Sequence, residues 1–137
     1  LAGLVAITAG CNVVGPVSAI IIGLFAGILV DLAVICIDKL KVDDPVGAIA
    51  VHGINGLFGT IAVGLFASDG GLFFGGGLSF LTTQVIGVLA IATFSFTFTF
   101  IIMKIMEKVF GIRISREEEI AGIDSVSFGV ESYSTYE

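Results

Sequence analysis

The fold is decided by residues 45–68, which read PVGAIAVHGINGLFGTIAVGLFAS and contain no Asp, Glu, Lys or Arg. Residues 1–30 and 70–103 lack these four residue types as well. A helix of about 20 apolar residues crosses the ~30 Å hydrocarbon core of a bilayer, so each run is long enough to span it. Only 13% of the chain is charged, against about 25% in an average soluble domain. The sequence therefore predicts an all-α, polytopic transmembrane helix bundle.

Helix-breaking residues divide the chain into segments. Glycine, asparagine and proline around position 15 end the first run, and a charged linker and a glycine-rich loop end the next two. We expect residues 1–110 to form a membrane domain and residues 111–137 a polar tail. Within the membrane domain the expected segments are a partial helix over 1–14 and spans over about 15–37, 45–67 and 78–106.

Residues 94–100 read FSFTFTF and alternate with period 2, as in a β-strand. A transmembrane barrel would repeat such segments of about 10 residues between turns. This pattern occurs once, inside an uncharged run far too long for one strand, so we expect a helix there.

The basic residues indicate the orientation. Two lysines lie in the linker 38–43, none in the loop 68–77, and four basic residues in 104–116. The positive-inside rule places the linker and the tail in the cytoplasm, with the chain crossing the cell membrane several times. Residues 111–137 carry six acidic residues against two arginines, a net charge of −4 out of −6. This acidity indicates a water-exposed appendage and argues against a nucleic-acid partner.

The only histidine, His52, lies inside the predicted span 45–67. Asp44 and Pro45 have the composition of a helix N-terminus, which places His52 about 12 Å into the helix and near the midplane. Small and polar residues recur around it at spacings of three and four, on one expected face: Ala48, His52, Asn55 and Gly59. Two interpretations are open. The face is either a tight helix–helix contact or a pore wall into which the imidazole points.

The sequence offers little for other chemistry. It contains no nucleophile–base pair, phosphate-binding loop, cofactor motif or metal-ligand spacing, so we expect neither an enzyme nor a bound cofactor. Cys11 and Cys36 are interpreted as small packing residues. Asp31 is either paired within the bundle or directed toward the membrane interface.

Three motifs carry a resemblance to the ammonium transporter family, the Amt/Mep/Rh group. Asp43-Asp44-Pro45 followed by Val51-His52-Gly53 is the most specific of them. Residues 3–10 resemble the eighth helix of the family, and residues 113–124 resemble its cytoplasmic tail. The resemblance covers nearly the whole chain, as the last three to four helices of an eleven-helix Amt-type fold.

The resemblance implies a homotrimer in the lipid bilayer, with one narrow hydrophobic pore per protomer for ammonium or ammonia. His52 matches the second of a pair of pore histidines, and the first belongs to helices that this chain lacks. Ile7 and Ala48 match apolar pore-lining positions, and Asn55 lies next to them on the expected face. The tail implies a regulatory surface near the docking site of a P-II signalling protein, made by Glu117, Glu118, Glu119, Gly122 and Asp124.

The tail departs from the family in one place. Where family tails often continue into His-Gly-Glu, this chain reads Ser127-Phe128-Gly129-Val130-Glu131, which puts regulation through the tail in doubt. The alternative functions are an Rh-like ammonia or carbon dioxide channel, an ammonium sensor presenting a signalling tail, and a structural bundle without a pore.

Overall fold

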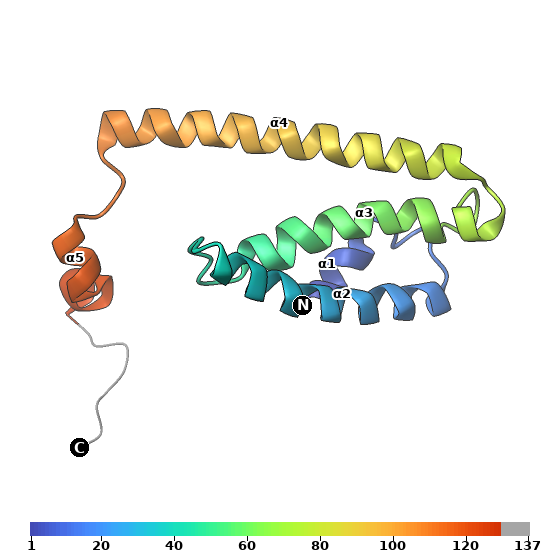
Figure 1. Cartoon of the computed structure of the whole chain (residues 1–137), viewed down its shortest axis with the longest axis horizontal. Coiled ribbons are helices and arrows are strands. Elements are labelled where there is room, and N and C mark those ends of the chain that lie inside the picture. Colours follow the sequence, from blue (N-terminus) through green and yellow to red (C-terminus); the bar gives the residue numbers. More distant parts are fainter. Residues whose placement is uncertain (130–137) are drawn as a thin grey trace, which may run out of the picture. The chain divides into compact units, whose positions relative to one another are not determined.

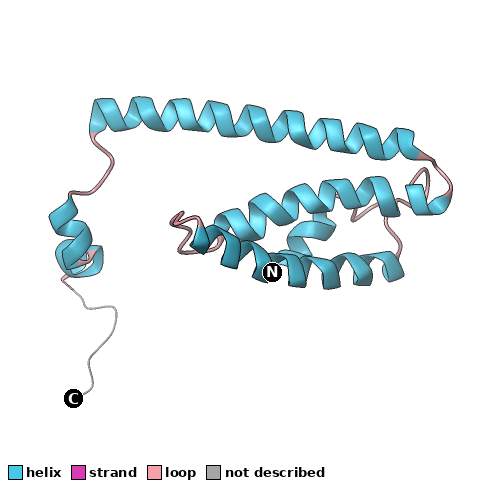
Figure 2. Ribbon diagram, viewed as in Figure 1, coloured by secondary structure: helices cyan, strands magenta, loops and turns pink. Residues whose placement is uncertain are grey.

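The computed structural model describes residues 1–129, which are mostly helical and contain no β-strand (Figures 1 and 2). The predicted all-α class is thereby confirmed. The elements are α1 (Ala2–Thr8), α2 (Pro16–Lys39), the π-helix η1 (Ile49–Ile54), α3 (Asn55–Phe66), the 3-10 helix η2 (Leu72–Phe74), α4 (Leu78–Phe110), α5 (Arg116–Ala121) and the π-helix η3 (Asp124–Phe128). The tail residues Val130 and Glu131 lie outside the described residues.

Within the described part of the chain, three helices are long and apolar enough to cross a membrane: Pro16–Lys39, Ile49–Phe66 and Leu78–Phe110. Residues 94–100 lie inside α4, which confirms the helix predicted there despite the strand-like alternation. Helical structure after the linker begins at Ala48, directly before η1, and not at Pro45, because residues 44–47 form a turn first. The chain divides into two compact units, Leu1–Phe94 and Ser95–Glu137.

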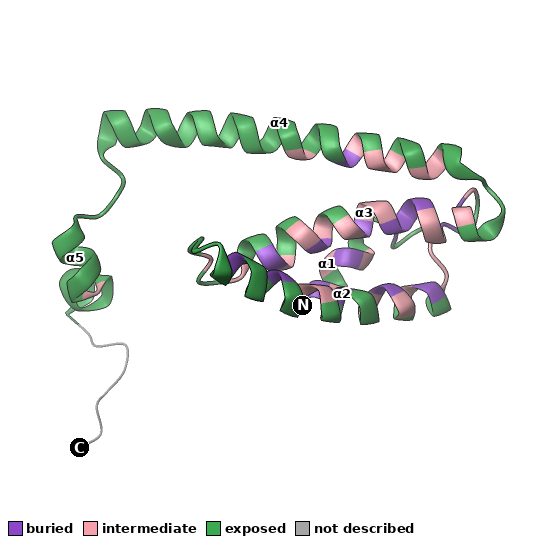
Figure 3. Ribbon diagram, in the orientation of Figure 1, coloured by how far each residue is buried: buried purple, intermediate pink, exposed green. Residues whose placement is uncertain are grey.

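The first unit is held together by small side chains. Helix α1 packs on α2 and α3, and the shared core consists of Ala6, Ile22, Ala26 and Ala62. A second cluster joins α2 to η1 through Ala33, Ile37 and Ala50. Figure 3 shows these buried positions on the facing sides of the three helices, with exposed residues on their other sides. Lipid tails are as apolar as leucine side chains, so the hydrophobic effect does not hold membrane helices together. Close packing does so instead, and small side chains such as alanine allow it.

Gly59 sets the closest approach between α1 and α3. A Cβ atom placed on Gly59 would overlap the carbonyl group of Ala6 and lie 2.9 Å from the Ala6 Cα atom. A side chain at position 59 would therefore push the two helices apart. The loop after α1 is also tied to the end of α3, because the Ser68 N–H donates to the Val13 carbonyl oxygen at 2.8 Å.

The glycine-rich loop between α3 and α4 turns the chain without side-chain strain. Gly70, Gly75 and Gly77 have φ angles of 83°, 86° and 69°, a region that L-residues with a Cβ atom rarely adopt. The ring of Phe73 in this loop packs edge-on against Phe66 at the end of α3, with centroids 5.1 Å apart. The loop is thereby fixed to the helix that precedes it.

The second unit contains the C-terminal part of α4, a turn at Gly111, and the short elements α5 and η3. Gly111 ends α4 with a φ angle of 63°. Its N–H donates to the Glu107 carbonyl oxygen at 2.9 Å, as in a helix end closed by a left-handed residue.

Candidate functional site

The site is built on the π-helical turn that carries His52. In a π-helix the backbone pairs residues five apart and not four, and such turns are frequent at functional sites. Asp44 Oδ2 accepts hydrogen bonds from the N–H groups of Ile49 and Ala50, at 2.9 and 3.2 Å. At the other end, Asn55 Nδ2 donates to the Ala50 carbonyl oxygen at 2.9 Å. Asp44 thus caps two N–H groups at the start of η1, and Asn55 donates to a carbonyl group within it.

Pro45 lies in the turn before η1 and is not part of the helix. Gly47 closes this turn with a φ angle of 68°, and its N–H donates to the Asp44 carbonyl oxygen at 3.0 Å. Asp44 therefore has two roles. Its side chain caps the start of η1, and its backbone carbonyl accepts the hydrogen bond that closes the preceding turn.

His52 is exposed on the first unit and lines an open groove of about 400 Å³. One wall comes from its own helix, from Gly53, Gly56, Leu57 and Thr60. The other wall comes from α4, from Val88, Ile91 and Ala92. The glycines leave room beside the imidazole. The groove is apolar apart from His52 and Thr60, whose hydroxyl donates to the Gly56 carbonyl oxygen at 3.1 Å.

The residues Gly53, Gly56, Leu57 and Thr60 are absent from the predicted pore set. The spacing of four residues from His52 to Gly56 and from Gly56 to Thr60 is the sequence signal that points to this groove. The contribution of α4 has no comparable signal, because nothing in its apolar stretch distinguishes Val88 from its neighbours.

Asn55 and Gly59 lie on a different side of the helix from His52. Asn55 is completely buried, and its Oδ1 atom has no hydrogen-bond partner among residues 1–129. Gly59 is buried against Ala6. The face expected to join these residues to His52 is therefore not observed. Spacing alone therefore misplaces Asn55 and Gly59, whereas Gly56 and Thr60, four and eight residues after His52, do line its groove.

The other predicted pore residues are dispersed. Ala48 is exposed and directly precedes η1. Ile7 is half-buried and packs against the core around Ala6, so it does not line the His52 groove. Asp31, which is not one of the predicted pore residues, is exposed on α2.

The tail helix α5 begins with a capping box. The Ser115 Oγ atom accepts from the Glu118 N–H at 3.2 Å, and Glu118 Oε2 accepts from the Ser115 N–H at 2.9 Å. The Ser115 backbone N–H, followed by its side chain, lowers the pKa of the Glu118 carboxyl below its ordinary value of 4.5. Glu117 and Glu119 lie exposed in the same first turn, where a helix N-terminus favours negative charge. Gly122 ends α5 with a φ angle of 88°, and Asp124 begins η3.

Comparison with known proteins identifies the family. A model of the Ammonium Transporter Family matches residues 1–133. The chain is 36% identical to "Ammonium transporter Amt2" of Archaeoglobus fulgidus over 148 aligned residues, covering 99% of this chain and 31% of that protein. It is 40% identical to "Ammonium transporter Amt1" of the same organism, covering 90% of this chain and 33% of that protein. An "Ammonium transporter" of Bacillus subtilis is 37% identical, covering 97% of this chain and 35% of that protein.

The chain spans about a third of the length of these relatives. Its apolar helices and its family together make it a multi-pass membrane protein. Since the family model covers nearly all of the sequence, the chain belongs to the ammonium transporter family.

Proposed function

We propose that this chain forms part of a transport pore for ammonium or ammonia, in which His52 is a hydrogen-bonding residue of the wall. The observation that carries the proposal is the exposed imidazole of His52 in a groove whose lining is otherwise apolar except for Thr60, on a helix long enough to cross a membrane. The relatives named as ammonium transporters support the substrate.

The chemistry of the groove suits a small neutral molecule. A bare cation in an apolar passage loses its hydration at a cost of many kcal/mol, so it needs either water or a strong partner. Ammonia lacks the extra proton of ammonium and is neutral, so it crosses at far lower cost. An imidazole nitrogen gives it one hydrogen bond on the way. His52 is the only histidine in the sequence, so the second histidine of a pair comes from a segment outside these residues or from another protomer.

Ala48 and Ile7 would supply apolar wall in the assembled pore. Asn55 acts differently, as a positioning residue. Its amide holds the Ala50 carbonyl group inside the π-turn and so fixes the direction from which His52 leaves the helix. Asp44 holds the opposite end of the same turn. Transport through such a wall requires no enzymatic step.

The assembly we propose is a homotrimer in the cell membrane with a cytoplasmic C-terminus. The large number of exposed apolar residues on α2 and α4 supports burial of these helices in lipid or against other helices. The acidic first turn of α5, with Glu117, Glu118 and Glu119, is the proposed regulatory contact for a P-II protein.

The test is methylammonium uptake by the full-length protein carrying His52→Ala. Losing one hydrogen bond to the permeating molecule costs about 1–3 kcal/mol, so uptake should fall by roughly 5- to 150-fold or change its selectivity. Cys36→Ala, an exposed position on α2 outside the groove, is the matched control and should transport like the wild type. Unchanged uptake and selectivity in a correctly inserted His52→Ala protein would contradict the proposal.

A further inference from the structure

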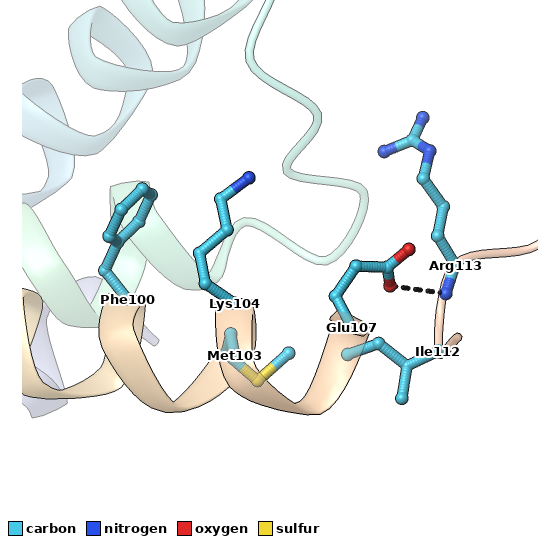
Figure 4. Close-up of a pocket in the computed structure, with 6 residues that line it drawn as sticks. All are labelled: Phe100, Met103, Lys104, Glu107, Ile112 and Arg113. Carbon is cyan, nitrogen blue, oxygen red and sulfur yellow. Dashed lines mark hydrogen bonds between the residues drawn. The ribbon is translucent and has the colours of Figure 1, made fainter. Parts of the chain in front are cut away.

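The C-terminal end of α4 forms a second pocket, of about 470 Å³, that the transport proposal does not use. It is lined by Phe100, Met103, Lys104, Glu107, Ile112 and Arg113, all within the second unit (Figure 4). Its lining combines apolar and charged side chains, a composition typical of the membrane–water interface.

A local turn directly after α4 forms this pocket. Gly111 turns the backbone after α4, and the Arg113 N–H then donates to Glu107 Oε2 at 2.9 Å. This hydrogen bond, drawn as a dashed line in Figure 4, places Ile112 and Arg113 beside the last turns of α4. One oxygen of the only acidic group in the lining is thus occupied in closing the turn.

The two cations remain available to a ligand. Figure 4 shows Lys104 and Arg113 extending to the same side of the chain. The Lys104 Nζ atom lies 5.6 Å from the ring centroid of Phe100, a cation–π contact that leaves its N–H groups free to bind an anion. Arg113 makes an ion pair of 3.6 Å with Glu119, but their side chains are 73% and 55% exposed, so the pair is weak.

The length of α4 and the position of its first charge indicate that this pocket lies at the edge of the hydrocarbon core. Its 33 residues extend about 50 Å at 1.5 Å per residue, which exceeds the ~30 Å hydrocarbon core of a bilayer. Residues 70–103 contain no charged side chain, so Lys104 is the first charge after the apolar span. A lysine at that position extends its ammonium group into the headgroup layer while its stem stays on apolar surface.

We propose that this pocket binds the headgroup of one anionic phospholipid, with the phosphate held between Lys104 and Arg113. The acyl chains would lie along the exposed apolar surface of α4, where Phe96 and Phe100 stack with centroids 6.0 Å apart. A soluble phosphate would use the two cations but would gain nothing from Phe100, Met103 and Ile112.

The experiment measures lipid binding to the full-length protein in detergent, with phosphatidylglycerol as the probe and phosphatidylcholine as the neutral reference. Each cation near an anionic lipid contributes about fivefold to binding, so Lys104→Gln with Arg113→Gln should weaken phosphatidylglycerol binding by roughly 25-fold. Phosphatidylcholine binding should not change. The charge-preserving pair Lys104→Arg with Arg113→Lys should bind phosphatidylglycerol as the wild type does.

The matched control is Lys39→Gln with Lys41→Gln. It also removes two positive charges, from the linker that the positive-inside rule assigns to the same membrane side. Phosphatidylglycerol binding should survive this change. The proposal is overturned if both double variants weaken binding equally, which means a general surface attraction. It is also overturned if the pocket variant binds like the wild type, or if millimolar inorganic phosphate displaces the lipid.

Discussion

Gly59 gives the sharpest test of how closely α1 and α3 pack. A methyl group at this position would overlap the Ala6 carbonyl group and lie 2.9 Å from the Ala6 Cα atom, and both obstructing groups are backbone. Backbone cannot rotate away as a side chain can, so the helices must separate. Overpacking of this kind costs about 1–3 kcal/mol.

The matched control is Gly56, one turn earlier in the same helix. A Cβ atom there meets no atom within 4 Å among residues 1–129. Alanine has a higher helix propensity than glycine, which raises the free energy of unfolding by up to about 1 kcal/mol at either position. This gain cancels when the two variants are compared. The free energy of unfolding of Gly59→Ala should therefore lie about 1–3 kcal/mol below that of Gly56→Ala.

Circular dichroism at 222 nm during heating of the full-length protein in detergent would measure this difference. At about 2–4 °C per kcal/mol, the Tm of Gly59→Ala should be roughly 2–12 °C below that of Gly56→Ala. If Gly59→Ala melts at the same temperature as Gly56→Ala or higher, the close contact with Ala6 does not constrain the bundle and the reasoning fails.

Two further predictions concern the helix starts. Asp44→Ala should lower the free energy of unfolding by about 0.5–2 kcal/mol, because two N–H groups at the start of η1 lose their acceptor; an unchanged Tm in the same heating experiment would exclude this role. For the tail, the pKa of Glu118 is lower in the folded state than its ordinary 4.5, so the carboxylate stabilises α5 fully above about pH 4.5. This stabilisation is lost as the pH falls through the lower folded pKa, and amide hydrogen exchange of residues 116–121, corrected for intrinsic rates, should then accelerate. Glu118→Gln removes the titrating carboxyl and should abolish this pH dependence, and a dependence that persists in that variant would assign it to another group.

Much of the fold follows from charge-free runs. The apolar stretches predict α2 and α4 because a membrane helix requires length and apolarity, and both properties are visible in the chain. The same argument decides that residues 94–100 belong to a helix despite their strand-like alternation. The capping box at the start of α5 also has a sequence signature, Ser115 followed three residues later by Glu118.

The arrangement around His52 is less accessible to sequence. Helical spacing predicts one face for His52, Asn55 and Gly59, but Asn55 and Gly59 are buried while His52 is exposed. A π-turn has no strong local signature, since it depends on side chains such as Asn55 that take up displaced backbone groups. Spacing rules assume a uniform helix, so a π-turn makes them unreliable for pairs that lie across it, while pairs beyond it, such as Gly56 and Thr60, keep the regular spacing.

The sequence by itself determined that this chain crosses a membrane, that its single histidine lies within a span, and which family it resembles. These properties reside in composition, run length and short motifs, which need no knowledge of distant contacts. Only the tertiary structure decided that Asn55 is buried while His52 is exposed, and that Val88, Ile91 and Ala92 of α4 complete the His52 groove. Burial and groove lining depend on which helix faces pack together, and that is fixed by contacts such as Gly59 on Ala6 between residues far apart in the chain.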